Sequence, residues 1–215
     1  NVNGDSVQIL DVTLLLVTIT LLPTLVVMMT SFTRYVVSLS FLRTAMGTQQ
    51  TPPNMVLVGM ALILTLFTMT PTINAIKESA YDPYKEGRIT QEEFFERAQE
   101  PLKEYMLNQM QISSMELYCN MTDTPIPQSQ DEARELPMTV IMPAFVTAEL
   151  KHAFIIGFLL YIPFLLIDII VSSTLMSMGM VMLPPSMIST PFKILLFILL
   201  DGWQLLFSTL VGMIR

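Results

Sequence analysis

Four long apolar segments alternate with polar sequence along the 215-residue chain, and they dominate its pattern. The segments cover residues 7–29, 55–76, 153–175 and 194–214. Each is close to the ~20 residues that a helix needs to cross a bilayer. Aspartate or proline interrupts the first, third and fourth segments, and helix breakers at membrane depth indicate packing against other protein or a water-filled cavity. The pattern predicts an all-α, membrane-associated fold of helical hairpins with broken helices.

The polar sequence between the second and third apolar segments predicts short helices. Thr90-Gln91-Glu92-Glu93 fits a capping box, and apolar residues then recur at helical spacing. Ser113-Ser114-Met115-Glu116 fits a second capping box, and Pro101 is expected to kink the first helix or to begin a new one. Two stretches are expected to be loops: residues 122–127 and 129–135. Three domains are therefore predicted: an N-terminal hairpin (1–76), an acidic helical domain (77–135) and a C-terminal hairpin (136–215).

Charge follows the same division of the chain. Only 13% of the residues are charged, about half the share of an ordinary soluble domain. Residues 77–135 hold 13 of the 18 Asp and Glu and 6 of the 11 Lys and Arg, so the net charge of −7 lies there. No basic stripe is available to neutralise phosphates, which argues against a nucleic-acid partner. Because basic short loops prefer the cytoplasm, Arg34 and Arg43 predict that the acidic domain lies on the outer face.

Three aspartates, Asp11, Asp168 and Asp201, lie inside apolar segments, where an unpaired carboxylate costs about 2.5–3.5 kcal/mol on insertion scales. We expect them to be hydrogen-bonded or ion-paired anchors between packed helices. Four basic side chains are available as partners: Arg34, Arg43, Lys151 and Lys193. Two alternatives stay open at this point. One is a small-solute or proton-coupled transporter that uses Asp168 and Asp201, and the other is an aspartyl protease with the same pair.

Other signals of enzyme chemistry are sparse. His152 is the only histidine, which leaves little for a histidine metal site or a Ser/His/Asp arrangement. No phosphate-binding glycine loop and no Cys-x-x-Cys pair occur. Cys119 is the only cysteine, and we expect it to be a buried thiol that packs as a small hydrophobe. The sequence therefore predicts no catalytic, cofactor-binding or metal-binding residues.

The most distinctive stretch lies between the third and fourth apolar segments. It holds four methionines in seven residues, followed by two prolines: Met176, Met178, Met180, Met182, Pro184 and Pro185. Gly179 and the prolines argue against an uninterrupted helix. Because methionine is flexible and polarizable, such a cluster can close an irregular opening and repack when something passes through it. The alternative is that these side chains are hydrophobic filler in a chain with 18 methionines.

Several sequence blocks, in a fixed order from residue 7 to residue 214, carry a resemblance to a known family. The N-terminal blocks are Met28-Met29-Thr30-Ser31-Phe32-Thr33-Arg34, Ser40-Phe41-Leu42-Arg43 and Gly47-Thr48-Gln49-Gln50-Thr51-Pro52-Pro53-Asn54. The C-terminal blocks are Pro143-Ala144-Phe145, Glu149-Leu150-Lys151, Pro163-Phe164-Leu165-Leu166-Ile167-Asp168, Pro184-Pro185, Pro191-Phe192-Lys193 and Asp201-Gly202-Trp203-Gln204-Leu205-Leu206. Together they resemble the FliP family of flagellar type III export-gate proteins and its counterparts in virulence-associated secretion.

The resemblance implies a non-catalytic subunit of a protein export gate. Several copies are expected to assemble with FliQ- and FliR-type subunits into a helical ring, in contact with other export apparatus proteins and membrane lipids. Unfolded flagellar proteins would thread the central channel. The resemblance also implies the bacterial inner membrane and flagellar basal body, a periplasmic location for residues 77–135, and a signal peptide removed before Asn1.

The family also has a methionine gasket that narrows the closed channel, and it maps onto Met180, Val181 and Met182. Val181 stands where relatives that resemble the enteric proteins carry a third methionine, which implies a stiffer gasket. Met176 and Met178 are additional pore-lining candidates. The candidate polar anchors for assembly are Asp168, Asp201, Arg34, Arg43, Lys151 and Lys193.

Overall fold

The computed structural model of the protein describes residues 16–17, 20–21, 23–180 and 183–214. Within these residues the structure is helical and contains no β-strand, so the predicted all-α fold is confirmed. After a helical stretch that ends at residue 28, the elements in chain order are α2 (Phe32–Met46), α3 (Asn54–Ile76), the π-helix η1 (Lys77–Tyr81), α4 (Asp82–Lys85), α5 (Gln91–Gln109), α6 (Ile112–Met121), α7 (Gln130–Glu135), α8 (Met138–Ser177), α9 (Pro185–Leu199) and α10 (Gly202–Gly212).

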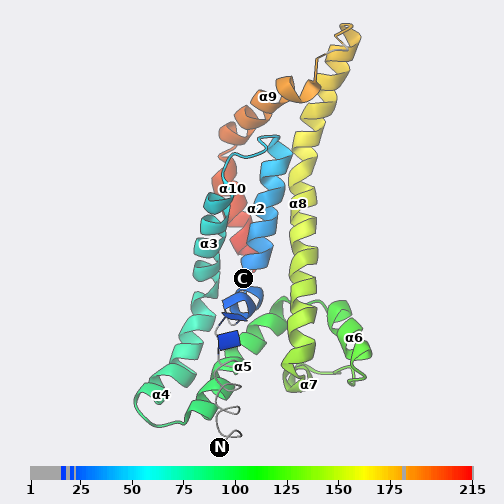
Figure 1. Ribbon diagram of the computed structural model, residues 1–215. Coiled ribbons are helices and arrows are strands. Elements are labelled where there is room, and N and C mark those ends of the chain that lie inside the picture. The colour runs from blue at the N-terminus through cyan, green and yellow to red at the C-terminus, as the bar shows by residue number, and fades with distance from the viewer. Residues whose placement is uncertain (1–15, 18–19, 22, 181–182, 215) are drawn as a thin grey trace, which may run out of the picture.

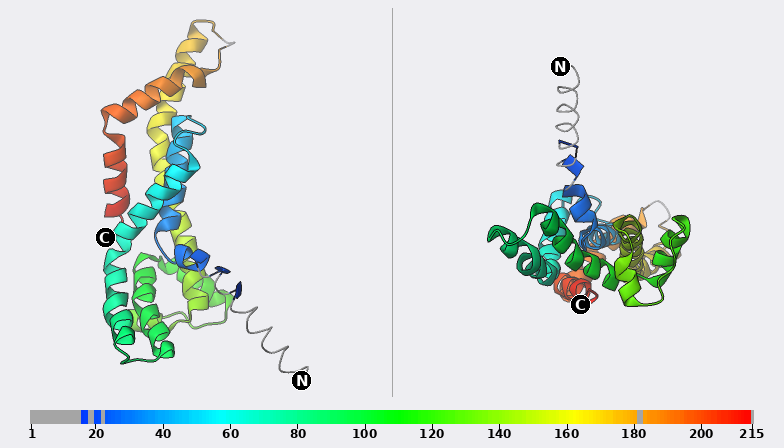
Figure 2. Two further views of the ribbon diagram at one scale, coloured as in Figure 1. Left: turned by 60° about the vertical axis from the view of Figure 1, so that its left-hand side comes forward. Right: turned by 90° about the horizontal axis from the view of Figure 1, so that it is seen from below.

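The 40-residue helix α8 forms the long axis of the molecule, about 60 Å at 1.5 Å per residue. Figure 1 shows α2 and α3 beside its middle, α5 to α7 around its lower end, and α9 turning back from its upper end. Figure 2 shows α10 running back down beside the bundle after α9 has crossed over its top. This arrangement leaves the connection between α8 and α9 at the extreme upper end of the molecule.

Among the described residues, two helices are long and apolar enough to cross a membrane: the run Asn54–Lys85, which includes α3, and α8. The second apolar segment is therefore a helix as predicted, and the third lies inside α8, which begins 15 residues earlier than expected. Most of the first apolar segment, including Asp11, lies outside the described residues.

The fourth apolar segment is a broken helix and not one straight span, in line with the broken helices that the sequence predicts. The axes of α9 and α10 differ by 66°, with the break at Leu200 and Asp201. Asp201 has φ 48°, a left-handed conformation that aspartate tolerates better than most residues. A Cβ on Gly202 would come within 2.3 Å of the Phe197 ring, so only glycine allows the two helices to approach this closely. The broken helix thus follows from local backbone geometry.

Two apolar cores hold the helices together. In the upper core, buried side chains from α2, α3, α8 and α10 meet, among them Leu39, Ala61 and Leu210. Gly157 on α8 allows a close approach to α2, because a Cβ there would lie 2.5 Å from the Phe41 ring. In the lower core, Met106 of α5 and the buried Cys119 of α6 pack against the first half of α8, among other residues. Cys119 is therefore the small buried hydrophobe that the sequence predicts.

The acidic segment is helical, with one capping box as predicted and one that is wrong. Thr90 caps α5, since its hydroxyl accepts from the Glu93 N–H while the Glu93 carboxylate accepts from the Thr90 N–H at 2.7 Å. At the second site α6 begins one residue before Ser113, because the backbone already turns at Gln111, whose carbonyl accepts the first helical bonds. The two serines therefore lie inside the first turn instead of capping it.

Two further local expectations fail: no new helix begins at Pro101, whose expected kink stays a prediction, and residues 130–135 are not a loop. Pro101 lies inside α5 without ending it. Because proline has no N–H, the Arg97 carbonyl lacks its helical donor. Arg97 is exposed, so water can donate to that carbonyl instead. Residues 130–135 form α7 instead of a loop, because the Ser129 hydroxyl accepts from the Glu132 N–H. The Ser-x-x-Glu spacing of this cap was present in the sequence. Residues 122–127 contain no helix, as predicted. The three-domain division itself stays a prediction.

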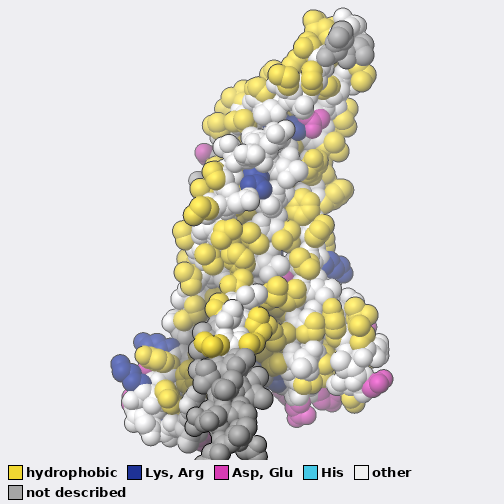
Figure 3. All heavy atoms as spheres, viewed as in Figure 1, with side chains coloured by type: hydrophobic (Ala, Val, Ile, Leu, Met, Phe, Trp, Pro, Cys, Tyr) yellow, Lys and Arg dark blue, Asp and Glu magenta, His cyan; other side chains and the backbone are white. Residues whose placement is uncertain are grey.

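The surface repeats the charge pattern of the sequence. In Figure 3 acidic and basic side chains gather at the lower end, around the helices of residues 77–135, whereas hydrophobic side chains cover most of the upper part. Long apolar side chains are exposed on α3, α8 and α9. An apolar surface of this extent needs lipid or another protein to cover it.

Candidate functional site

A capping motif at Gly179 ends α8 and begins the methionine tip, which we define as residues 176–184. The Met180 N–H donates to the Leu175 carbonyl at 3.0 Å, and the Gly179 N–H donates to the Met176 carbonyl at 3.1 Å. These two bonds form a Schellman motif, which requires a left-handed residue, and Gly179 has φ 76°. Helix α9 restarts at Pro185, where a missing N–H costs nothing. The predicted interruption of the helix is therefore confirmed.

The methionine side chains of the tip are exposed to different degrees. Met176 and Met178 are 67% and 63% exposed, and Met180 is 43% exposed. Val181 and Met182, the other two residues of the predicted gasket, lie outside the described residues. The tip stands at the far end of the molecule from the acidic helices (Figure 1). A short apolar segment held at the end of a two-helix hairpin can meet the same segment of other subunits.

An ion pair fastens α9 to α8 below the tip. The Lys193 ammonium donates to the Asp168 carboxylate at 2.6 Å and to the Ala45 carbonyl at the end of α2 at 3.1 Å. The second oxygen of Asp168 accepts from the buried Ser189 hydroxyl at 2.6 Å. One lysine thus joins three helices and satisfies the half-buried carboxylate. No hydrogen bond or ion pair links Asp168 to Asp201 within the described residues.

A second ion pair lies buried where α2 crosses α8. The Arg34 guanidinium contacts both carboxylate oxygens of Glu149, with the Nε bond at 2.9 Å, and both side chains are at most 2% exposed. The same guanidinium donates to the Gln109 side chain at 3.2 Å and contacts His152 Nδ1 at 3.1 Å. Sequence reasoning had named Arg34 as an anchor but had missed Glu149. An acid inside an apolar stretch, two residues before a lysine, was the signal that could have found it.

The remaining predicted anchors are not in ion pairs within the described residues. Lys151 donates to the Gln111 side chain at the junction of α5 and α6. Arg43 donates to the Pro52 carbonyl at 3.4 Å and to the Asn54 side-chain oxygen. Asp201 is exposed at the break between α9 and α10 and caps neither helix with its side chain.

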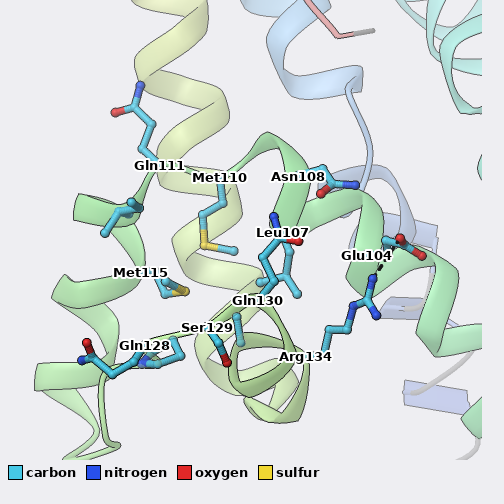
Figure 4. Close-up of a pocket in the computed structure, with 13 residues that line it drawn as sticks. Glu104, Leu107, Asn108, Met110, Gln111, Met115, Gln128, Ser129, Gln130 and Arg134 are labelled. Atoms are coloured by element: carbon cyan, nitrogen blue, oxygen red, sulfur yellow. Dashed lines mark hydrogen bonds and ion pairs between the residues drawn. The ribbon is translucent and has the colours of Figure 1, made fainter.

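The acidic end of the molecule contains a cavity of about 450 Å³ between α5, α6 and α7, lined by both polar and apolar side chains. Figure 4 shows amide side chains such as Asn108 and Gln128 around it, with the Glu104–Arg134 ion pair at 3.2 Å on one side. The residues described by the structure contain no cluster of three or more His, Cys, Asp or Glu that could hold a metal ion.

Several groups near the acidic end titrate away from their ordinary values. Hydrogen bonds from the backbone and hydroxyl of Thr90 hold the pKa of Glu93 below its usual range. Burial, and then the charge of Glu149, raise the pKa of Tyr105. Burial also raises the pKa of the Cys119 thiol, which keeps it protonated and unreactive.

Comparison with known proteins points to one family. The sequence profile of the FliP family matches residues 15–210 of this chain. The similar proteins include several named flagellar biosynthetic protein FliP, among them those of Pectobacterium carotovorum subsp. carotovorum (48% identical, over 91% of this chain and 75% of the relative), Bacillus subtilis strain 168 (47%, over 92% and 88%) and Aquifex aeolicus strain VF5 (45%, over 97% and 87%). The chain belongs to the FliP family.

Family membership confirms the resemblance seen in the sequence. The chain is a component of the flagellar export apparatus, with apolar helices of the kind that embed in membranes. FliP proteins are structural components of that apparatus and not enzymes, which removes the aspartyl protease alternative.

Proposed function

We propose that this chain is a structural and gating subunit of the flagellar type III export channel, and that its methionine tip narrows the pore. The observation that carries the proposal is the construction of the tip, where Gly179 ends one helix and Pro185 begins the next. Methionines are thereby presented at the end of the hairpin and stay exposed on this chain. Tips from several copies would form an apolar constriction that dewets and excludes ions, yet repacks around an unfolded chain.

The gate would contain further copies of this chain together with FliQ- and FliR-type subunits, arranged as a helical ring. The apolar surfaces on α3, α8 and α9 support this arrangement, since lipid and neighbouring subunits would cover them. Other proteins of the export apparatus would contact the ring, and unfolded flagellar proteins would be its substrates. We place the assembly in the bacterial inner membrane with residues 77–135 on the periplasmic side.

The polar anchors would keep the hairpin rigid within this assembly. The Lys193–Asp168 pair holds the first half of α9 against α8, directly below the tip. The Arg34–Glu149 pair holds α2 against α8 and reaches Gln109 at the end of α5. Rigid braces directly below the tip would let its methionine side chains repack without separating the helices that carry them.

A double substitution of Met180→Ala with Met182→Ala tests the gating role. Loss of side-chain volume at the constriction should leave assembly intact and make the closed gate leak ions, measured as channel conductance in a bilayer or as ion entry into cells. Met121→Ala is the control, because Met121 is an exposed methionine in the acidic segment, far from the tip. Conductance equal to that of the unmodified complex, in a double variant of full assembled mass, would contradict the gating role.

A further inference from the structure

In the apolar part of the chain, most of the described charged side chains form ion pairs with one another and a few do not. Outside residues 77–135 the described charged side chains are Arg34, Arg43, Glu149, Lys151, Asp168, Lys193 and Asp201. Two ion pairs form among them, Arg34–Glu149 and Lys193–Asp168. One carboxylate, that of Asp201, and two cations stay without an ion-pair partner in the described part of the chain.

Asp201 lies on a surface that is mostly apolar. The exposed residues around it in the sequence include Ile198, Leu199, Leu200 and Leu205, with Gln204 as an exposed polar neighbour. A carboxylate that is covered by lipid or by another apolar surface costs several kcal/mol when it has no partner. No side chain in the described part of the chain pairs with Asp201, so water or another molecule can supply its partner.

The two open cations lie at different ends of the molecule. Lys151 contacts Gln111 at the junction of α5 and α6, close to the acidic helices. Arg43 lies in the last turn of α2, two residues before Ala45, whose carbonyl accepts from Lys193 on α9. Arg43 is therefore at the level of α9, the helix that leads into Asp201.

Arg43 also has N–H donors that make no hydrogen bond within the described residues. It is half-buried, and its contacts within the chain are the neutral Pro52 carbonyl and the Asn54 side-chain oxygen, both reached through Nη1. A guanidinium has five N–H donors in a fork that suits a carboxylate, so the second nitrogen can bind an acid from outside.

An apolar cavity of about 300 Å³ adjoins Asp201. Its lining includes Leu200, Gly202 and Leu205 from the break between α9 and α10, together with Pro163 and Phe164 of α8. A cavity of this kind accepts an apolar side chain of a partner, and such anchors lie typically at the centre of an interface. The surface around Asp201 thus combines a charge with an apolar pocket.

We propose that Asp201 of one copy of this chain forms an ion pair with Arg43 of the next copy. No hydrogen bond or ion pair joins the two residues within the described part of one subunit. A contact between two different residues that is repeated from one copy to the next is head-to-tail, the type that generates rings or helical assemblies. The inference rests on the proposed assembly of several copies and names the charge pair that sets their register. This single contact gives a partner both to the Asp201 carboxylate and to the Arg43 guanidinium.

A charge exchange tests the pair. Asp201→Lys and Arg43→Glu should each lower the yield of full-mass detergent-extracted complex by about tenfold or more, and the double variant should restore it. The left-handed backbone at position 201 strains lysine in the single and double variants alike, so rescue reports the charge pair alone. Lys151→Glu combined with Asp201→Lys has the same net charge as that double variant and should not restore assembly.

Cysteine cross-linking gives an independent readout in a Cys119→Ala background. Co-expressed Asp201→Cys and Arg43→Cys chains should form a disulfide-linked dimer of this chain under mild oxidation, and one chain with both cysteines should form a ladder. The pairing is overturned if wild-type complexes hold several copies but neither rescue nor cross-link appears, or if Cys at position 201 cross-links to a smaller subunit. A wild-type complex with a single copy would overturn the proposed assembly as well.

Discussion

Removal of Arg34 should be the most destabilising single change at the crossing of α2 and α8. In Arg34→Met the buried Glu149 carboxylate loses both of its bonds to a cation, and Gln109 and His152 each lose a contact. Removal of one partner of a buried ion pair costs about 3–5 kcal/mol, because the other charge remains desolvated. Both partners are at most 2% exposed, so water cannot replace the guanidinium without opening the contact between α2 and α8. We therefore expect the upper end of that range.

Thermal or denaturant unfolding of the purified complex in detergent measures this cost. The double variant Arg34→Met with Glu149→Leu removes both charges and should regain most of the lost stability, since apolar replacement of a whole buried pair is often neutral. Arg34→Lys keeps the charge but not the fork and should fall between the two. A loss below about 1 kcal/mol for Arg34→Met, or a double variant no more stable than the single one, would refute the reasoning.

Three further changes have defined outcomes. Gly157→Ala should cost about 1–3 kcal/mol in the same unfolding assay, because the new Cβ meets the Phe41 ring, and Phe41→Leu should recover part of it. Gly179→Ala should cost about 1–2 kcal/mol and speed amide exchange in the last turn of α8, because φ is 76° there; unchanged exchange would argue against the cap. Thr90→Ala should raise the pKa of Glu93 in an NMR titration, because one donor to the carboxylate is lost. The lowered pKa means that this cap stabilises α5 above the ordinary pKa of glutamate and is lost as the pH falls through the lowered value.

Much of the candidate site could be recognised from residues that are unusual for their surroundings. A glycine, two prolines and a cluster of methionines between apolar segments predicted the interrupted helix, since those residues act through their own backbone and side-chain geometry. Arg34, Asp168 and Lys193 were recognised because a charge in an apolar stretch needs a partner. The choice of partner was not readable, because Arg34 and Glu149 are 115 residues apart and meet through the packing of α2 on α8.

Local signals failed where two of them competed. Pro101 carries a strong helix-breaking signal, yet α5 continues through it because the helix around it has solvent access and packs at Lys103 and Met106. Ser113 has the residues of a cap, yet the turn at Gln111 begins the helix earlier. The break at Asp201 depends on Gly202 lying against Phe197, a contact between two helices that no periodicity reports.

The sequence by itself determined that this protein is all-α, that its net negative charge lies in one acidic segment, and that a methionine-rich apolar stretch interrupts the C-terminal helices. Composition and hydrophobic periodicity are properties of each segment, so they can be read without knowing which segments pack together. Only the tertiary structure decided which charges pair, that α9 and α10 bend by 66°, and that the methionine tip stands at the end of the longest helix. The charge pairs arise from contacts between residues far apart in the chain, whose energies depend on distance and burial and not on sequence spacing. The bend depends on the packing of Gly202 against Phe197, which hydrophobic periodicity does not report.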